Sequence, residues 1–220
     1  MGILYIVGTP IGNLEDITKR ALRILSEVDL ILCEDTRNTK VLLDHYQIKT
    51  PTLSYHQHSR LKKTEDIANF LREGKNIALV SDAGTPGISD PGNQLVEEAI
   101  KSLGDLVKIV PIPGPSALAA AASVSGFPMD RFLFLGFPPV KKRRSMFFEE
   151  VINSKYPVIF YESPYRILKT LKELSSLEVL VCRELTKKFE TIYRGTAAEI
   201  IRSLEKEGIR GEFAVIVKKQ

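Results

Sequence analysis

Short apolar runs alternate with amphipathic segments along the first half of the chain. The apolar runs predict strands at 4–8, 28–35, 76–82 and 107–114, and apolar residues at helical spacing predict helices at 13–27, 36–47, 64–74 and 92–104. Asn13 is a suitable N-cap for the first of these helices. Strands rich in Val and Ile that alternate with helices predict an α/β domain with a largely parallel sheet.

The alternation continues after the bend "PIPGPS" at 111–116, where prolines redirect the chain. A helix of small residues is predicted at 116–126; strands are predicted at 131–139, 157–164, 177–185, 190–195 and 212–219, and helices at 142–154, 165–176 and 197–208. We therefore expect two α/β domains, 1–112 and 113–220.

Three turns rich in Gly, Pro and Ser follow predicted strands, at 8–13, 81–92 and 113–117. In an open α/β sheet, ligands bind beside the carboxyl ends of the strands, and glycines let backbone groups touch them. None of the three turns contains Lys or Arg, so we expect a ligand that is not strongly anionic, such as a nucleoside with a zwitterionic tail. An ordinary loop is the alternative reading of each turn, and tight packing on a sheet is the alternative role of the small-residue helix.

The composition narrows the class of protein. A net charge of +4 and a pI near 9.0 permit an acidic partner such as nucleic acid without requiring one. Cys33 and Cys182 are far apart, which argues against a disulfide framework and favours a reducing compartment. With no secretory leader and no apolar run of membrane-spanning length, we expect a soluble, cytoplasmic protein.

Several common sites are missing from the sequence. It has neither a P-loop nor a dinucleotide-binding fingerprint. The histidines are His45, His56 and His58; the last two share one face of an extended segment, but no Cys or carboxylate ladder accompanies them. We therefore expect no metal site.

Eight segments along the chain carry a family resemblance: "VGTPIGNLEDI", "CEDTR", "SYHQH", "VSDAGTPGISDPG", "PIPGPSA", "FLGFPP", "FYESPYRI" and "RELTKKFE". In this order they resemble the bacterial 16S ribosomal-RNA cytidine 2'-O-ribose methyltransferases, in the tetrapyrrole-methylase-like class. The resemblance implies a two-domain α/β fold of the tetrapyrrole methylase type, S-adenosylmethionine in the cleft between the domains, and a homodimer. It also implies 2'-O-methylation of one cytidine ribose in 16S ribosomal RNA, which we expect on the assembled small ribosomal subunit.

The resemblance also implies which residues contact the cofactor. They are Pro10, Asp82, Gly84, Thr85, Pro86, Ile88, Ser116 and Ala117, with backbone contacts near Leu185. Many relatives carry an extra C-terminal helical domain, whereas this sequence stops at "EFAVIVKKQ". We therefore expect that domain to be absent and the RNA to be held by other surfaces.

A ribose 2'-hydroxyl is a poor nucleophile, so a base or hydrogen-bond acceptor is useful. Candidates at strand ends are Glu34, Asp35, Glu162 and Glu184, each of which is equally suited to a helix cap or an ion pair. Candidate RNA contacts are basic residues that would meet phosphates, with a solvated helix face as the alternative: Arg37, Lys40, Lys141, Lys142, Arg143, Arg144 and Lys187.

Two other functions remain open at this point. A small-molecule methylase acting on a tetrapyrrole or corrinoid would share the cofactor loops but present an apolar trough to its substrate. A non-catalytic RNA-binding protein would share the fold, although intact cofactor loops argue against it.

Overall fold

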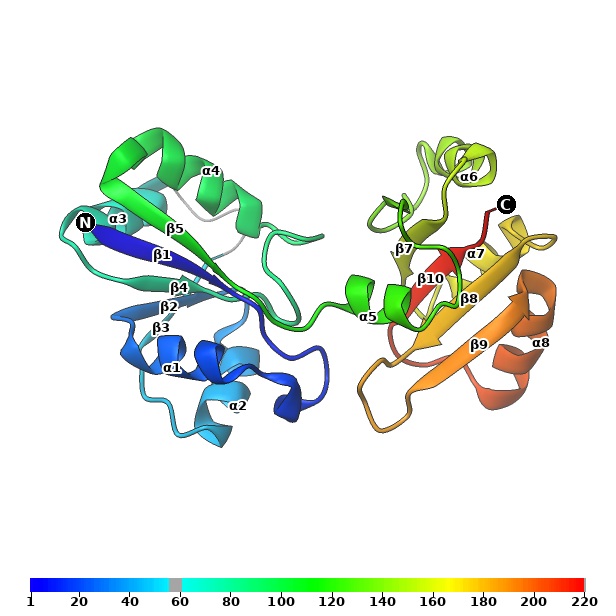
Figure 1. Ribbon diagram of the computed structural model, residues 1–220, viewed down its shortest axis with the longest axis horizontal. Helices are drawn as coiled ribbons and strands as arrows, with labels where there is room; N and C mark the ends of the chain where they lie inside the picture. Colours follow the sequence, from blue (N-terminus) through cyan, green and yellow to red (C-terminus); the bar gives the residue numbers. More distant parts are fainter. Residues whose placement is uncertain (56–60, 220) are drawn as a thin grey trace. The chain divides into compact units, whose positions relative to one another are not determined.

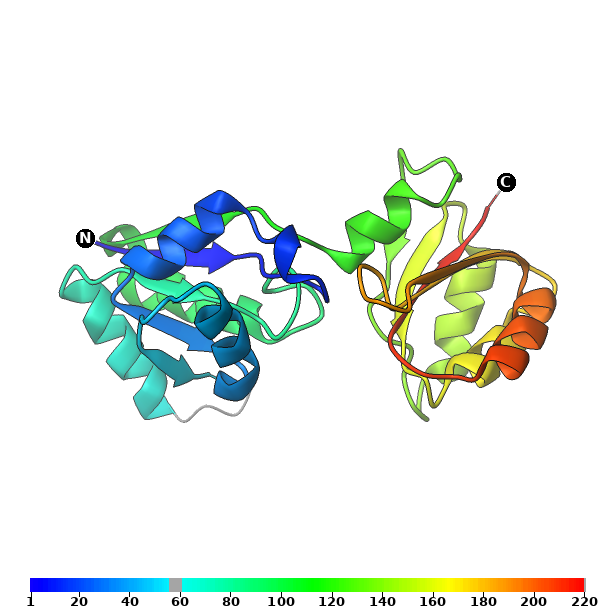
Figure 2. The same cartoon turned by 90° about the horizontal axis from the view of Figure 1, so that it is seen from below.

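The structure is a computed structural model that describes residues 1–55 and 61–219. It contains two compact units, Met1–Ser116 and Ala117–Gln220. Each unit has its own sheet and its own core, as Figures 1 and 2 show. His56 and His58, the two histidines considered above, lie outside the described residues.

The first unit is built on a parallel sheet with the strand order β3-β2-β4-β1-β5. Its elements in chain order are β1 (Gly2–Val7), the 3-10 helix η1 (Leu14–Asp16), α1 (Lys19–Glu27), β2 (Leu30–Cys33), α2 (Thr36–His45), β3 (Thr52–Ser54), α3 (Leu61–Arg72), β4 (Ile77–Leu79), α4 (Gly92–Leu103), the 3-10 helix η2 (Gly104–Leu106) and β5 (Val107–Ile112). The predicted parallel α/β sheet is therefore confirmed.

Helices cover both faces of this sheet. α1 and α2 bury Leu25 and Leu43 against one face, where they meet strand residues such as Ile31. α3 and α4 bury Leu71 and Leu95 against the other face (Figure 1). A strand that is covered on both faces must be apolar on both, which explains why β2 and β4 are continuous apolar runs.

The second unit is built on a mixed sheet with the order β6-β7-β10-β8-β9. Only the β6–β7 pair is parallel among its pairings. The elements are α5 (Ala117–Ser123), β6 (Leu133–Phe134), α6 (Arg144–Asn153), β7 (Val158–Glu162), α7 (Ile167–Glu173), β8 (Glu178–Arg183), β9 (Thr191–Thr196), α8 (Ala197–Glu207) and β10 (Phe213–Val217).

The two faces of the second sheet are covered unequally. α6, α7 and α8 pack on one face around Phe148, Leu171 and Ile200. The small-residue helix α5 covers the other face and buries Ala121 against Ile159 and its neighbours. Small side chains allow this close approach of helix and sheet, so the packing role of α5 is present in the structure.

Several details differ from the sequence predictions, and the strand predicted at 131–139 spans only Leu133–Phe134. Asn13 does not cap a long helix: it caps η1, accepting a hydrogen bond from the Glu15 N–H, and Thr18 caps α1 by accepting one from the Ala21 N–H. The short strand β3 was not predicted, because a three-residue strand leaves no periodic signal. Among the described residues, no helix has both the length and the apolar character needed to cross a membrane.

Candidate functional site

The predicted loops gather at the carboxyl edge of the first unit's parallel sheet. β1 and β4 are neighbours in this sheet, and the chain leaves them toward opposite faces, into α1 and α4. Such a point of divergence opens a crevice outside the strand ends and is the usual ligand site of open α/β sheets. The turns 8–13 and 81–92 follow these two strands, and the turn 113–117 follows β5, the other neighbour of β1.

Backbone hydrogen bonds join the turns to one another. The Thr9 N–H donates to the Gly84 carbonyl at 2.8 Å, and the Gly84 N–H donates to the Thr9 carbonyl at 3.1 Å. Gly8 lies so close to Gly114 that a Cβ on Gly114 would sit 2.6 Å from the Gly8 carbonyl oxygen. Glycine is therefore required at this crossing, and backbone contacts hold the loops against one another.

Loop 81–92 is also fixed from within. The Thr85 hydroxyl donates to the Pro115 carbonyl at 3.2 Å. Asp90 Oδ1 accepts from the backbone N–H groups of Gly87 and Gly92, both at 2.7 Å, so it ties the loop to the first turn of α4. The sequence marked this loop through its Gly and Pro content, but it gave no sign of the Thr9 backbone hydrogen bonds that hold it.

Asp82 connects this loop to the end of β2. Its side chain is exposed and accepts hydrogen bonds from the Asp35 N–H at 3.2 Å and the Asn38 amide at 3.3 Å. Asp35 caps α2 and pairs with Arg37 at 2.6 Å. The Arg37 side chain, with the Arg37 N–H, lowers the pKa of Asp35 to about 2. Asp35 is therefore a structural anion and a weak base.

The exposed groups along this edge suit a largely uncharged ligand. Gly84 and Pro86 are buried within the loop, Pro10, Thr85 and Ser116 are half-buried, and Asp82 and Ile88 are exposed. The edge therefore offers an apolar side chain, backbone amides and carbonyls, and one carboxylate. This donor set fits a flat base with ribose hydroxyls and an ammonium group, and it lacks the cations that a triphosphate needs.

The second unit contains Ala117 and Leu185. Ala117 is half-buried as the first residue of α5, and Leu185 packs on the sheet face that α5 covers. Their predicted contacts with the cofactor stay predictions.

Glu162, a candidate base, is a buried carboxylate whose oxygens are hydrogen-bonded within the protein. Its side chain has no exposed surface and accepts from the Arg166 guanidinium at 2.8 Å and the Thr170 hydroxyl at 2.5 Å. The Arg144 guanidinium lies 4.0 Å away. The prediction of a base at Glu162 is therefore wrong on structural grounds, because no acceptor atom is open to a substrate.

Glu184 is also engaged. Its Oε1 accepts from the Glu212 N–H at 2.9 Å and the Lys187 ammonium at 3.0 Å. Burial acts to raise the pKa of Glu184, but these two donors outweigh it and the pKa is lowered. Lys187 binds Glu212 as well, so its charge is shared between two carboxylates. Glu34, the remaining candidate base, directly follows β2. It is half-buried and also makes contacts within the protein.

The residues of the basic run 141–144 differ in exposure where α6 begins. Lys141, Lys142 and Arg143 are exposed, and within the described residues their side chains form no ion pair. Arg144 is buried and donates to Glu173 at 3.0 Å and to the Thr170 hydroxyl at 2.8 Å. The predicted RNA contact at Arg144 is therefore wrong, because its guanidinium faces the protein interior. Lys40, on α2, is exposed.

In the described part of the chain, no group of three or more His, Cys, Asp or Glu side chains is arranged to hold an ion. Cys33 and Cys182 are both buried, and burial raises the pKa of the Cys182 thiol to about 12.

Known proteins resemble this chain both in sequence and in fold. The family model for tetrapyrrole (corrin/porphyrin) methylases matches residues 3–201. Ribosomal RNA small subunit methyltransferase I of Thermotoga maritima is 47% identical over 221 residues, which cover 99% of this chain and 98% of the relative. The Bacillus subtilis protein of the same name is 45% identical over 223 residues, which cover 99% of this chain and 75% of the relative.

Solved structures agree on the fold. Diphthine synthase matches with a TM-score of 0.77 at 12% identity, over 100% of this chain and 91% of its own. The cobalamin biosynthetic enzyme cobalt precorrin-4 methyltransferase matches with a TM-score of 0.69 at 20% identity, over 98% and 94%. The chain therefore belongs to the tetrapyrrole methylase family and, within it, to the ribosomal RNA small subunit methyltransferases I.

Proposed function

We propose that the protein methylates the ribose 2'-oxygen of one cytidine in 16S ribosomal RNA, with S-adenosylmethionine as methyl donor. The observation that supports the substrate most strongly is the identity of 47% to a ribosomal RNA small subunit methyltransferase along almost the whole of both chains. The rigid, largely uncharged carboxyl edge of the first sheet supports the donor.

The cofactor would be held mainly by backbone and small groups. Gly84, Thr85 and Pro86 form the buried part of loop 81–92, and the exposed Ile88 offers an apolar contact for the adenine ring. The Asp82 carboxylate suits the ribose hydroxyls or the ammonium of the methionine part. Pro10, Ser116 and Ala117 are the further contacts that we propose in the neighbouring turns.

The donor supplies a methyl group on a positively charged sulfur, which is already activated for transfer. In the reaction the ribose oxygen forms a bond to the methyl carbon, the carbon–sulfur bond breaks with its electron pair left on sulfur, and the hydroxyl proton goes to water. The chain's work is to orient the acceptor oxygen in line with that bond and to exclude competing water. Asp35, Glu162 and Glu184 are all engaged by cations or N–H groups. Positioning is therefore proposed to contribute more than base catalysis.

The substrate is proposed to be the assembled small subunit. The chain has 31 basic and 27 acidic residues, so its field attracts a naked strand only modestly. Folded RNA is recognised by shape and phosphate placement, and a reactive nucleotide has to be exposed to reach an active site.

Transfer of a labelled methyl group tests this function. Purified protein, S-adenosylmethionine labelled in the methyl group and small subunits lacking the modification are incubated, and the RNA is hydrolysed in alkali. Label in an alkali-resistant dinucleotide marks a 2'-O-methyl ribose, because the blocked oxygen cannot attack the adjacent phosphate. Label on a base, or no label in the RNA, would contradict the proposal.

A further inference from the structure

A network of buried charges holds one loop of the second unit in place. The loop 136–143 joins β6 to α6. Arg166 donates to the Pro138 carbonyl at 2.8 Å, and Arg144 donates to the Pro139 carbonyl at 3.3 Å. Both arginines also approach Glu162, whose side chain is fully buried. The loop backbone is therefore clamped to the turn between β7 and α7.

The clamped segments expose large aromatic side chains. Phe137 is 52% exposed and Tyr165 is 96% exposed. Phe137 directly precedes Pro138, and Tyr165 directly precedes Arg166, so the Arg166 hydrogen bond brings the two backbone segments together. The Phe137 ring also lies 5.5 Å from the ring of the half-buried Tyr161. Phe137 therefore packs in part against Tyr161, but both Phe137 and Tyr165 remain exposed to solvent.

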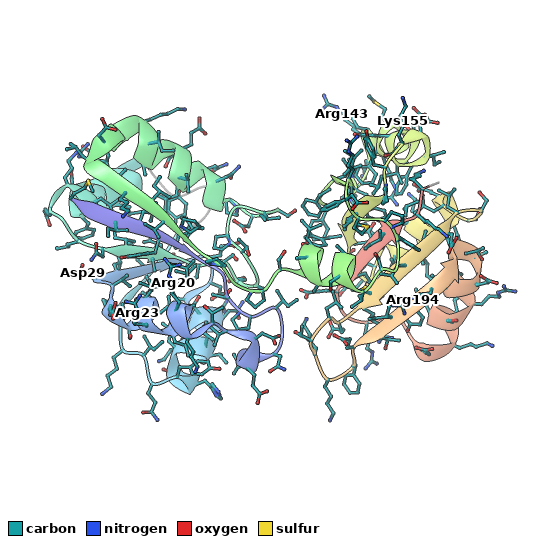
Figure 3. The ribbon with its side chains drawn as sticks, in the orientation of Figure 1. Arg20, Arg23, Asp29, Arg143, Lys155 and Arg194 are labelled. Atoms are coloured by element: carbon teal, nitrogen blue, oxygen red, sulfur yellow. The ribbon has the colours of Figure 1, made fainter. Side chains whose placement is uncertain are left out.

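Exposed cations lie close to Phe137 in the sequence. Lys141, Lys142 and Arg143 follow in the same loop and are exposed without an ion pair in the described structure. Figure 3 shows Arg143 extending outward beside α6. Lys155, which the same view labels, comes after the C-cap Ser154 of α6, so Arg143 and Lys155 flank this helix in sequence.

We propose that Phe137, Tyr165, Lys141, Lys142 and Arg143 form an RNA-binding surface for an unpaired segment of the substrate; this rests on the proposed function. Every base has a face that stacks on an aromatic ring, and cations beside the rings follow the phosphates. Glu162, Arg144 and Arg166 act as positioning residues that hold this surface. A protein partner would suit the aromatic rings but gives no reason for three adjacent unpaired cations.

Binding measured without a methyl donor tests the surface separately from catalysis. The probe is a fluorescein-labelled, cytidine-rich 20-nucleotide single-stranded RNA, with the same RNA annealed to its complement for comparison. The double variant Phe137→Ala/Tyr165→Ala is expected to bind the single strand at least tenfold more weakly, with a smaller effect on the duplex. The triple variant Lys141→Ala/Lys142→Ala/Arg143→Ala is expected to flatten the slope of log affinity against log salt by about 2.

The cation control replaces two Lys and one Arg, as the test variant does, and the aromatic control replaces a single exposed aromatic residue. Tyr156→Ala removes an exposed aromatic at the other end of β7, and Lys155→Ala/Arg202→Ala/Lys206→Ala removes three exposed cations elsewhere in the second unit. Control variants are expected to bind as wild type does. Equal losses in test and control variants would overturn the proposal. So would unchanged RNA affinity with altered sedimentation, which would assign the rings to a contact between protein copies. A wild-type protein that binds this RNA but transfers no methyl group would sink the proposed function alone.

Discussion

Gly84 sits where three features of the candidate site meet. Its backbone pairs with Thr9, it lies within loop 81–92, and its φ of +83° belongs to the left-handed region that side chains other than glycine rarely adopt. An added Cβ would also lie 3.3 Å from Ile11 Cγ2. The position therefore combines backbone conformation and close packing.

Replacement of Gly84 by Val is expected to reduce S-adenosylhomocysteine binding by at least tenfold. A β-branched side chain at this φ costs about 1–3 kcal/mol of strain and displaces the loop from its bound shape. Isothermal titration calorimetry measures the affinity. Gly74→Val is the matched control, because Gly74 has a φ of +84° in the same unit and its added Cβ would meet only Met1 N, at 3.8 Å. Equal affinities for the two variants would show that loop 81–92 does not hold the cofactor.

Residue types predicted where the loops lie, but they did not predict which charged side chains are buried and which partners they bind. Arg144 stands in one run with Lys141 and Lys142, yet it alone of these three turns inward, because Thr170 and Glu173 on α7 meet it there. Those partners are distant in sequence, so spacing within the run carries no sign of them. The burial of Glu162 was not predicted for the same reason, because its partners Arg144 and Thr170 lie on other elements.

At the scale of elements, the charge network links α6, β7 and α7. Glu162 ends β7, Arg144 begins α6, and Thr170 lies within α7. Their hydrogen bonds join three elements whose apolar sides already pack around Phe148 and Leu171. The network therefore fixes the orientation of these elements in addition to the apolar core.

Glu162→Gln is expected to destabilise the second unit by about 3–5 kcal/mol, because it removes the only fully buried anion facing Arg144 and Arg166 among the described residues. Urea unfolding followed by circular dichroism measures the loss. Glu173→Gln is the control, since this partly exposed partner contacts Arg144 alone and should cost about 1 kcal/mol or less. A Glu162 variant as stable as the Glu173 variant would contradict the clamping role.

Helices and long strands were largely predictable from the sequence, whereas pairing was not. The apolar runs at β7, β8 and β10 look alike, although β10 pairs antiparallel to both of the others. The direction of a strand depends on the connection that precedes it. The loop 184–190, for example, reverses the chain direction, so β9 pairs antiparallel to β8. In the first unit, helices follow the strands and enforce parallel pairing, so the pattern predicted that sheet correctly.

At the scale of the whole molecule, we propose that the two units have different tasks. The first unit has a carboxyl edge that suits the cofactor, and the second has the exposed aromatic and cationic loop. The family resemblance carried by "SDAGTPGISDPG" and its companion segments is confirmed by relatives that match along 99% of the chain. The residues alone favoured a ligand such as a nucleoside with a zwitterionic tail, whereas the proposal of a ribosomal RNA substrate rests on the relatives.

The most direct test compares methyl incorporation into three substrates: intact small subunits, protein-free 16S RNA, and a short oligonucleotide with the same target sequence. We expect one 2'-O-methyl group, on a single cytidine. We also expect the rate of methylation to be highest on the subunit, lower on the free RNA and lowest on the oligonucleotide. Mass spectrometry of nuclease fragments locates the modified nucleotide. Equal rates on all three substrates would contradict recognition of folded RNA, and absence of a 2'-O-methylcytidine from all three would contradict the proposed function itself.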